Sequence, residues 1–307
     1  MIEVKQLVKN YNDVKAVQSI DFNINHGEVV GFLGANGAGK STTLKILTGY
    51  ISQTTGSVLI DGLDIKKHSF EIRKIIGYLP ESNPLYLEQT VYDLLKFTAS
   101  VRNITGSKFK DAFHKVITQC GLKNVVHKKI NQLSKGYKQR VGLASAIIHN
   151  PKILILDEPV TGLDPNQIVE VRELIKNLGK EKLVLMSSHI LQEIEATVDR
   201  IIIIDQGKIV ADGSTKSLLK NYAGKIKLHL NVVGASKESV KKFEEKLNLK
   251  VTKVRLNKSS QFIDLEYSQK NDPREEIFNF AVKNRWVLLE MSSEKANLET
   301  LFRKLTK

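Results

Sequence analysis

Residues 28–47 read EVVGFLGANGAGKSTTLKIL, an apolar run that opens into a glycine-rich loop and continues in a helical pattern. Residues 34–41 (GANGAGKS) fit the spacing G-x-x-x-x-G-K-[ST], between a predicted strand and a helix predicted to begin near Lys40. Glycines allow backbone conformations that are closed to other residues, so main-chain N–H groups can surround phosphate oxygens. The helix N-terminus adds unpaired N–H donors and the positive end of a dipole. The stretch therefore predicts a nucleoside triphosphate site rather than a turn without a ligand.

The last residues of the loop predict how the triphosphate is held. The ammonium of Lys40 would reach the β- and γ-phosphates as a point charge, and the hydroxyl of Ser41 would coordinate Mg²⁺. The residues predicted to surround the phosphates are Gly34, Ala35, Asn36, Gly37, Ala38, Gly39, Lys40, Ser41 and Thr42.

A second element is the run ILILDE at residues 153–158, an apolar strand that ends in two carboxylates. A charge at the end of a buried strand is costly unless it is paired or bound to a metal, and ligand sites of α/β sheets lie at the carboxyl ends of strands. Asp157 is placed to hold Mg²⁺, and Glu158 to polarise an attacking water. An isolated Asp-Glu pair would more simply cap a helix, but together with the phosphate loop it favours hydrolysis.

Length and composition set the class of protein. The 307 residues suffice for a large domain and a smaller one, and 41% of them are hydrophobic, as in globular proteins. The apolar runs fall short of the ~18–20 residues that span a bilayer, and residues 1–10 lack a signal-peptide core, which predicts a cytosolic location. The lone Cys120 is expected to be a buried small hydrophobe.

Charge is unevenly distributed along the chain. The net charge is +14, and residues 214–307 hold 20 Lys and Arg against 11 Asp and Glu. Such a surface favours an anionic partner, namely nucleic acid, acidic lipid headgroups or an acidic protein face. The alternative is that the scattered lysines serve solubility alone.

The pattern of elements predicts an α/β domain over residues 1–220 and a smaller domain over residues 221–307. Between about residues 82 and 150, apolar residues recur at helical spacing, so we predict a helical subdomain inserted into the sheet domain. The order βαββαβ plus a helix after residue 220 suggests an α+β ferredoxin-like fold. Its predicted elements are strands 225–233, 251–256, 262–267 and 287–291 and helices 236–248, 273–286 and 297–305.

Residues 133–140 read LSKGYKQR and precede the Asp157 strand by about twenty residues. With the two motifs above, they make residues 1 to about 220 resemble the ATP-binding subunit of an ABC transporter, a P-loop NTPase fold. Ser134 is expected to cap a helix that runs to about Ile148. The resemblance implies ATP and Mg²⁺ as ligands, and a head-to-tail dimer in which each ATP lies between the phosphate loop of one subunit and the signature of the other. The signature residues are Ser134, Lys135, Gly136 and Tyr137, and the second and fourth of these depart from the common LSGGQ.

Other positions match landmarks of that family in order. Tyr11 matches the aromatic residue that stacks on adenine, a contact worth roughly 1–3 kcal/mol, although alone it would be a half-buried strand residue. Asp164 matches the loop that meets the partner subunit. His189 matches the histidine that contacts the γ-phosphate, whereas an isolated histidine is usually structural. Glu81 stands where the family usually has a glutamine on Mg²⁺, and we expect it to retain the metal contact.

The segments GYLPESNPLY (77–86) and LSKGYKQRVGLA (133–144), with the added C-terminal domain, look most like the ABC-2-type exporter branch and, within it, like gliding-motility-associated ATPase subunits. The resemblance implies a peripheral ATPase at the cytoplasmic face of the cell membrane. It would form a homodimer, or pair with another ATPase subunit, and drive separate integral membrane permeases. Their cytoplasmic helices would contact residues 78–86.

Two other functions fit parts of the sequence less well. An ABC ATPase that acts on nucleic acid or ribosomes would suit the basic C-terminal segment, but the chain has a single set of motifs and no heptad tract, so nucleic acid is not the expected partner. A binding module without hydrolysis is disfavoured by Glu158 and His189. The C-terminal domain is expected to act as a dimer clamp, with a small-molecule sensor or a contact to anionic lipid as alternatives.

Overall fold

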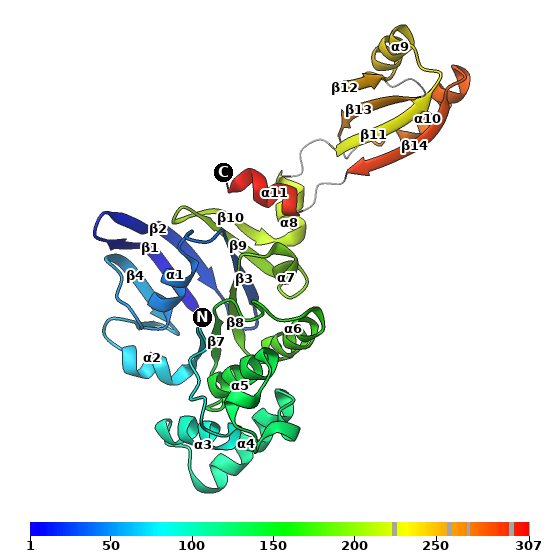
Figure 1. Ribbon diagram of the computed structural model, residues 1–307. Coiled ribbons are helices and arrows are strands. Elements are labelled where there is room, and N and C mark those ends of the chain that lie inside the picture. The colour runs from blue at the N-terminus through cyan, green and yellow to red at the C-terminus, as the bar shows by residue number, and fades with distance from the viewer. Residues whose placement is uncertain (223–225, 257–259, 269–270, 295–297, 307) are drawn as a thin grey trace. The chain divides into compact units, whose positions relative to one another are not determined.

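A computed structural model of the chain describes residues 1–222, 226–256, 260–268, 271–294 and 298–306 (Figure 1). The chain forms two compact units. One consists of Met1–Thr215 with the C-terminal stretch from Lys304, and the other of Lys216–Arg303. Each unit has a hydrophobic core of its own.

The first unit is built on a six-stranded sheet in the order β10-β9-β3-β8-β7-β6. Neighbouring strands run parallel except β9 and β10, which form a hairpin. Every residue of β3, β7 and β8 is buried, as expected for apolar strands with helices on both faces. The predicted strands before the phosphate loop and before Asp157 are thus confirmed. The strands are β3 (Val29–Leu33), β6 (Ile76–Leu79), β7 (Ile153–Leu156), β8 (Leu183–Ser188), β9 (Arg200–Asp205) and β10 (Lys208–Ser214).

A second sheet of the first unit is antiparallel, in the order β2-β1-β4-β5. Helix α1 (Lys40–Leu47) lies between the two sheets (Figure 1), and residues of both sheets and of α1 share one core. Phe22 of the antiparallel sheet and Phe32 of the parallel sheet have ring centroids 5.8 Å apart. The strands are β1 (Ile2–Tyr11), β2 (Val14–Ile24), β4 (Thr55–Ile60) and β5 (Leu63–Asp64), and α2 (Ser69–Ile75) follows them.

Three helices lie in the chain between β6 and β7, two strands that pair directly in the sheet, within the range of the predicted helical insertion. It carries α3 (Val91–Val101), α4 (Gly106–Gln119) and α5 (Lys135–Ile147), and its helices α3 and α4 lie far from the β1–β2 hairpin (Figure 1). Thr90 and Ser134 cap α3 and α5 through their side chains. Cys120 is buried as expected, and burial raises the pKa of its thiol to about 12. The other helices of the first unit are α6 (Pro165–Gly179) and α7 (Leu191–Glu195), and α8 (Thr215–Tyr222) begins at the boundary with the second unit.

The second unit has the predicted order of strands and helices. Its sheet is antiparallel in the order β12-β13-β11-β14, so the helix between β11 and β12 and the helix between β13 and β14 each join two strands that are not neighbours, as in a ferredoxin-like fold. Phe243, Phe280 and Trp286 pack with ring centroids 5.3–5.6 Å apart beneath one face of the sheet. The first residues of the predicted strand 225–233 and helix 297–305 lie outside the described residues. The elements are β11 (Ile226–Val233), α9 (Lys237–Leu247), β12 (Lys250–Leu256), β13 (Gln261–Tyr267), α10 (Arg274–Lys283), β14 (Val287–Glu294) and α11 (Leu298–Leu305).

Across the described ranges, none of the helices combines the length and the apolar character needed to cross a bilayer.

Candidate functional site

The loop between β3 and α1 is pressed against neighbouring backbone, which explains its glycines. A Cβ on Gly34 would lie 2.4 Å from the carbonyl oxygen of Ile204, and one on Gly39 would lie 2.5 Å from that of Ala16. Gly39 also has a φ of +107°, in the left-handed region that favours glycine. Residues 35–37, between these tight positions, are exposed. The loop is thus fixed at both ends and open to a ligand in its middle.

Lys40 is buried, and its ammonium points back into the loop. Nζ donates to the carbonyl oxygens of Gly34 at 2.8 Å and Ala35 at 3.2 Å, and it lies 3.5 Å from Oε1 of Glu158. A buried charge needs such partners. The first N–H groups of α1 have no acceptor within the helix, so they and the ammonium together suit a phosphate group.

Asp157 brings the predicted magnesium ligands together. Its Oδ1 accepts from Ser41 Oγ at 3.1 Å and from Ser187 Oγ at 2.6 Å, and the residue is 1% exposed. No group of three or more His, Cys, Asp or Glu side chains in the described part of the chain could hold a metal by itself. Mg²⁺ is usually held by one or two carboxylates, with substrate phosphates completing the shell. Ser41 and Asp157 therefore fit the protein's share of a magnesium site that a bound triphosphate completes.

Hydrogen bonds and ion pairs fix the position of Glu158. Its φ of +50° is unusual for a residue with a side chain, and its amide donates to Ser187 Oγ at 2.9 Å. Its Oε2 accepts from Thr161 Oγ1 at 3.0 Å and lies 2.9 Å from Nδ1 of His189. Such backbone strain, of order 1–3 kcal/mol, persists where the surroundings enforce it and is concentrated at active sites. The structure thus places Lys40, Glu158 and His189 in one cluster.

Three side chains of this neighbourhood were not predicted. Ser187 and Thr161 make the bonds to the two carboxylate residues described above, and Glu193 of α7 is buried beside them. Glu193 accepts from Ser188 Oγ at 2.8 Å, and burial raises the pKa of its carboxyl above the ordinary value. A signal for Ser187 existed, because it stands at the carboxyl end of β8, next to β7 in a parallel sheet. No comparable pattern in the sequence marks Thr161 or Glu193 as a site residue.

The signature residues lie at the start of α5, against the start of α6. Ser134 Oγ accepts from the amide of Tyr137 at 3.4 Å, and Asp164 accepts from that of Gln167 at 3.0 Å, so each caps its helix. A Cβ on Gly136 would lie 2.3 Å from Oε1 of Gln167, and one on Gly162 would lie 2.0 Å from Nζ of Lys135. The two helix starts are therefore packed together. Within the described residues, no hydrogen bond joins Ser134–Tyr137 to the Lys40 cluster.

The loop after β6 is attached to the same helix α5. Asn83 Nδ2 donates to the carbonyl oxygen of Lys138 at 2.9 Å and to Oε1 of Gln139 at 3.3 Å. A Cβ on Gly142 would lie 2.1 Å from Oδ1 of Asn83, so this approach requires a glycine in the helix. The loop that carries Glu81 is therefore held on the helix that carries the signature.

The two remaining predicted residues are exposed. Tyr11 ends β1 and is 45% exposed, with Nζ of Lys9 4.9 Å from its ring centroid. Its ring is free enough to stack on a base. Glu81 follows β6, and burial, followed by the charges of Asp157, Tyr50 and Glu81, raises the pKa of Tyr78.

Comparisons with known proteins agree with this geometry. A family model described as ABC transporter matches residues 17–161. The linearmycin resistance ATP-binding protein LnrL of Bacillus subtilis is 30% identical over 307 residues, which cover 100% of this chain and 98% of LnrL. The bacitracin transport ATP-binding protein BcrA of Bacillus licheniformis is 40% identical over 214 residues, or 69% of each chain.

The chain belongs to the ABC transporter ATP-binding family. A solved dimeric, post-hydrolysis structure of the ATP-binding cassette MJ0796 with ADP and Pi superposes with a TM-score of 0.64 at 26% identity, over 70% of this chain and 98% of that one. The predicted family, fold, ATP and Mg²⁺ are confirmed. This ABC protein binds and hydrolyses ATP as the energy-supplying subunit of a transporter, and such subunits dimerise and work with membrane permeases. The finer likeness to gliding-motility-associated subunits stays a prediction.

Proposed function

We propose that this subunit drives export through separate permeases at the cytoplasmic face of the membrane, with ATP hydrolysed by the Lys40 cluster. The direction of transport is supported by the relatives named for bacitracin transport and linearmycin resistance. The site assignment rests on one observation. Lys40, Asp157, Glu158 and His189 come from three separate segments and meet in one network of hydrogen bonds and ion pairs that includes Ser41 and Ser187.

Each residue of the network has a proposed role. Lys40 and the N–H groups of residues 34–42 bind the β- and γ-phosphates, and Ser41 and Asp157 hold Mg²⁺, which offsets phosphate charge when bound. Glu158 takes the proton of the attacking water. His189 orients the Glu158 carboxylate and contacts the γ-phosphate once ATP is present.

The remaining predicted residues complete the site in the dimer. The capped start of α5, Ser134–Tyr137, is proposed to receive the partner's ATP, because a helix N-terminus attracts anions. Asp164 would lie at the interface between the two ATPase subunits, Tyr11 would stack on adenine, and Glu81 would contact Mg²⁺.

We also propose that the two compact units are separate domains, joined near residue 220. The second unit carries much of the excess positive charge, which supports contact with anionic lipid at the membrane surface. The alternative action on nucleic acid is not favoured, because the relatives described above are named for transport and resistance.

Two variants test the site assignment. Lys40→Ala should lose most ATP affinity in a binding titration, whereas Lys66→Ala, at an exposed lysine, should keep it. Glu158→Gln should bind ATP, hydrolyse it at least about a hundredfold more slowly and accumulate as a closed dimer in size-exclusion chromatography. Glu195→Gln, at an exposed carboxylate, is the matched control. Rapid turnover by Glu158→Gln would assign the base elsewhere, and unchanged ATP affinity of Lys40→Ala would remove the phosphate loop from the site.

A further inference from the structure

The second unit exposes large apolar side chains at one edge of its sheet. They belong to helix α10 and to strand β14, which lies in contact with that helix. Phe278 is 53% exposed, Val282 60%, and Val287 and Leu289 57% each. A single exposed apolar residue needs no explanation, but a group on adjoining elements is typical of a contact surface.

The orientation of α10 places its two exposed apolar residues on the side away from α9. Phe280 of α10 turns toward α9, because its ring centroid lies 5.3 Å from that of Phe243. Phe278 and Val282 stand two positions before and after Phe280, which in a helix of 3.6 residues per turn is about 160° around the axis. α10 contacts β14, the last strand of the sheet, whereas α9 leads into β12 at the opposite edge. Phe278 and Val282 therefore lie at the same free edge as the exposed residues of β14.

The two edge strands of this sheet differ in charge. β12 carries Lys250, Lys253 and Arg255, all exposed. Charged side chains on an edge strand, lysine above all, hinder its pairing with another chain. β14 begins with Val-Leu-Leu (287–289) and has no lysine, arginine or proline over its whole length. The β14 edge thus lacks the charges that protect the β12 edge.

The exposed side of α10 is complementary to a second copy of itself. Glu275, Phe278 and Val282 are spaced three and four positions apart, so they share one side of the helix, and Arg285 follows its last turn. When two such helices pack antiparallel about a two-fold axis at the level of residue 280, residues equally far before and after this position face each other. Phe278 then meets Val282 of the copy, and Glu275 meets Arg285 of the copy.

The charged residues beside the apolar group favour a second copy over other occupants. Glu275 and Arg285 are exposed, and within the described residues neither forms an ion pair. In the two-fold arrangement they form two ion pairs, one at each end of the paired helices. The exposed Glu275, Glu276 and Glu290 make a lipid headgroup or nucleic acid a poor match for this edge, because both are anionic.

We propose that the second units of two copies of this chain bind each other through this surface, α10 against α10 and β14 beside β14, about a two-fold axis perpendicular to the sheet. The four exposed apolar residues of each copy form the centre of the contact, and Glu275 pairs with Arg285 of the other copy at both ends. None of these residues belongs to the ATP site, so the contact forms without nucleotide. It keeps the two ATPase units close to each other after hydrolysis, at a high effective concentration for the next closure.

The test measures self-association of the full-length chain without nucleotide by analytical ultracentrifugation. The wild type should form dimers at micromolar concentration. Phe278→Glu and Leu289→Lys should each raise the dissociation constant about tenfold or more, because each places a charge from both copies in the apolar centre. Phe70→Glu, at a phenylalanine of the first unit that is 62% exposed, is the matched control and should leave the constant unchanged.

A charge exchange tests which residues face each other. Glu275→Arg and Arg285→Glu should each raise the dissociation constant about fivefold or more, since each brings like charges together at both ends of the paired helices. The double variant has opposite charges at both ends again and should regain the wild-type constant. A loss of fold would affect the single and double variants alike, so recovery in the double variant marks a direct contact.

Cysteine crosslinking gives a second measurement of the same arrangement. An equal mixture of Phe278→Cys and Val282→Cys, oxidised without nucleotide, should give a disulfide-linked dimer in higher yield than either variant alone. The mixture of Asn279→Cys and Lys283→Cys, two exposed positions with the same spacing one residue further along α10, should give little. Cys120 is buried and does not contribute.

Three results would overturn the proposal. A wild-type chain that stays monomeric without nucleotide would show that the second units do not bind each other. A dimer whose dissociation constant is unchanged in Phe278→Glu and Leu289→Lys would place the contact elsewhere. Equal crosslinking of both cysteine mixtures, with no recovery in the double charge variant, would refute the two-fold arrangement of α10. The ATP-dependent dimer of Glu158→Gln is measured separately, so the proposed ATPase function can stand where this contact fails.

Discussion

Ser187→Ala should lower the free energy of unfolding of the nucleotide-free chain by more than the removal of a typical serine hydroxyl does. The Ser187 hydroxyl donates to the buried Asp157 carboxylate at 2.6 Å and accepts from the amide of Glu158 at 2.9 Å. Removing a hydrogen bond to a charged group costs about 1.5–3 kcal/mol, and a buried N–H left unpaired costs about 1–3 kcal/mol. We therefore expect the free energy of unfolding of the first unit to fall by roughly 3–5 kcal/mol.

Ser145→Ala is the matched control for this variant. The Ser145 hydroxyl, in α5, is also buried, but it has no hydrogen-bond partner among the described residues. The same substitution there removes no bond and places the better helix former, a gain of about 0.5 kcal/mol. Ser145→Ala should therefore leave stability unchanged or slightly higher.

Thermal unfolding of the full-length variants, followed by circular dichroism, measures the difference. In a cooperative unit of this size 1 kcal/mol shifts Tm by about 2–4 °C, so Ser187→Ala should lower Tm by roughly 6–20 °C. Ser145→Ala should stay within about 2 °C of the wild type. Equal shifts for the two variants would refute the reasoning that Ser187 ties the two carboxylate residues to β8.

Gly142→Ala places a Cβ 2.1 Å from Oδ1 of Asn83, so it should lower the free energy of unfolding by about 1–2 kcal/mol after the gain in helix propensity. In the Asn83→Ala background the clash is absent, so the same substitution should stabilise the protein. Calorimetry of the wild type, the two single variants and the double variant measures both effects. The folded state holds the pKa of His149 at about 4, mainly by burial, against an ordinary 6.5, so the unfolded chain takes up the proton first as pH falls. Stability should drop by about 2–3 kcal/mol between pH 6.5 and 4 in urea titrations, and His149→Gln should flatten this slope. Glu81→Gln should change the Mg²⁺ concentration for half-maximal hydrolysis, and an unchanged value would make the Glu81 charge incidental.

The sequence predicted the layers of the fold where hydrophobic periodicity is strong. The apolar runs at 153–156 and 183–188 became fully buried strands, and the helical spacing after residue 82 became the insertion. The antiparallel sheet formed by β1, β2, β4 and β5 was not predicted, because its register depends on pairings between distant segments. Residues 2–5, for example, pair with residues 57–60, and bulges interrupt the alternation that would mark the strands.

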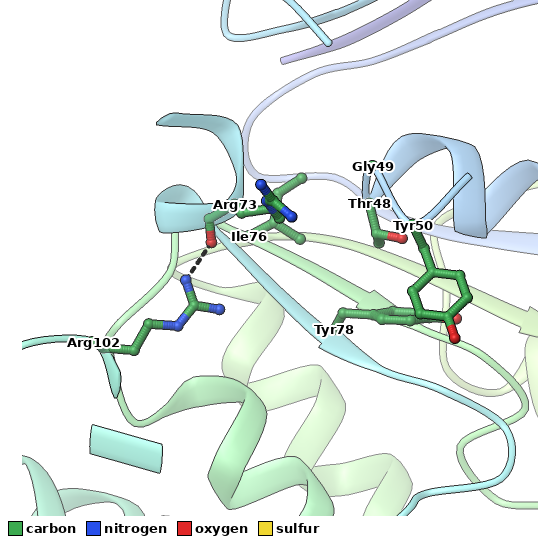
Figure 2. A pocket seen from close by; sticks show the side chains of 7 residues that line it. All are labelled: Thr48, Gly49, Tyr50, Arg73, Ile76, Tyr78 and Arg102. Atoms are coloured by element: carbon green, nitrogen blue, oxygen red, sulfur yellow. Dashed lines mark hydrogen bonds between the residues drawn. The ribbon is translucent and has the colours of Figure 1, made fainter. Parts of the chain in front are cut away.

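The site was predicted where a motif has fixed spacing. Lys40, Ser41, Asp157 and Glu158 lie together as the phosphate loop and the strand-end carboxylates indicated. Asn83 escaped prediction because its partners are backbone and amide atoms about 55 residues away, which no local pattern encodes. The hydrogen bond from Arg102 to the carbonyl oxygen of Arg73, shown in Figure 2, likewise depends on the meeting of α2 with the end of α3, since residues 73 and 102 share no motif.

The pairing of β6 with β7 has a consequence for how this family diverges. The two strands are parallel neighbours, with Ile76 paired to Ile153 and Leu79 to Leu156, so the helices inserted between them in the chain place no strand between them in the sheet. The sheet is therefore complete without the inserted helices, and substitutions in α3 or α4 need not disturb the strands that carry Asp157 and Ser187. One hydrolytic centre can in this way be matched to different membrane proteins by changing a region inserted between two neighbouring strands.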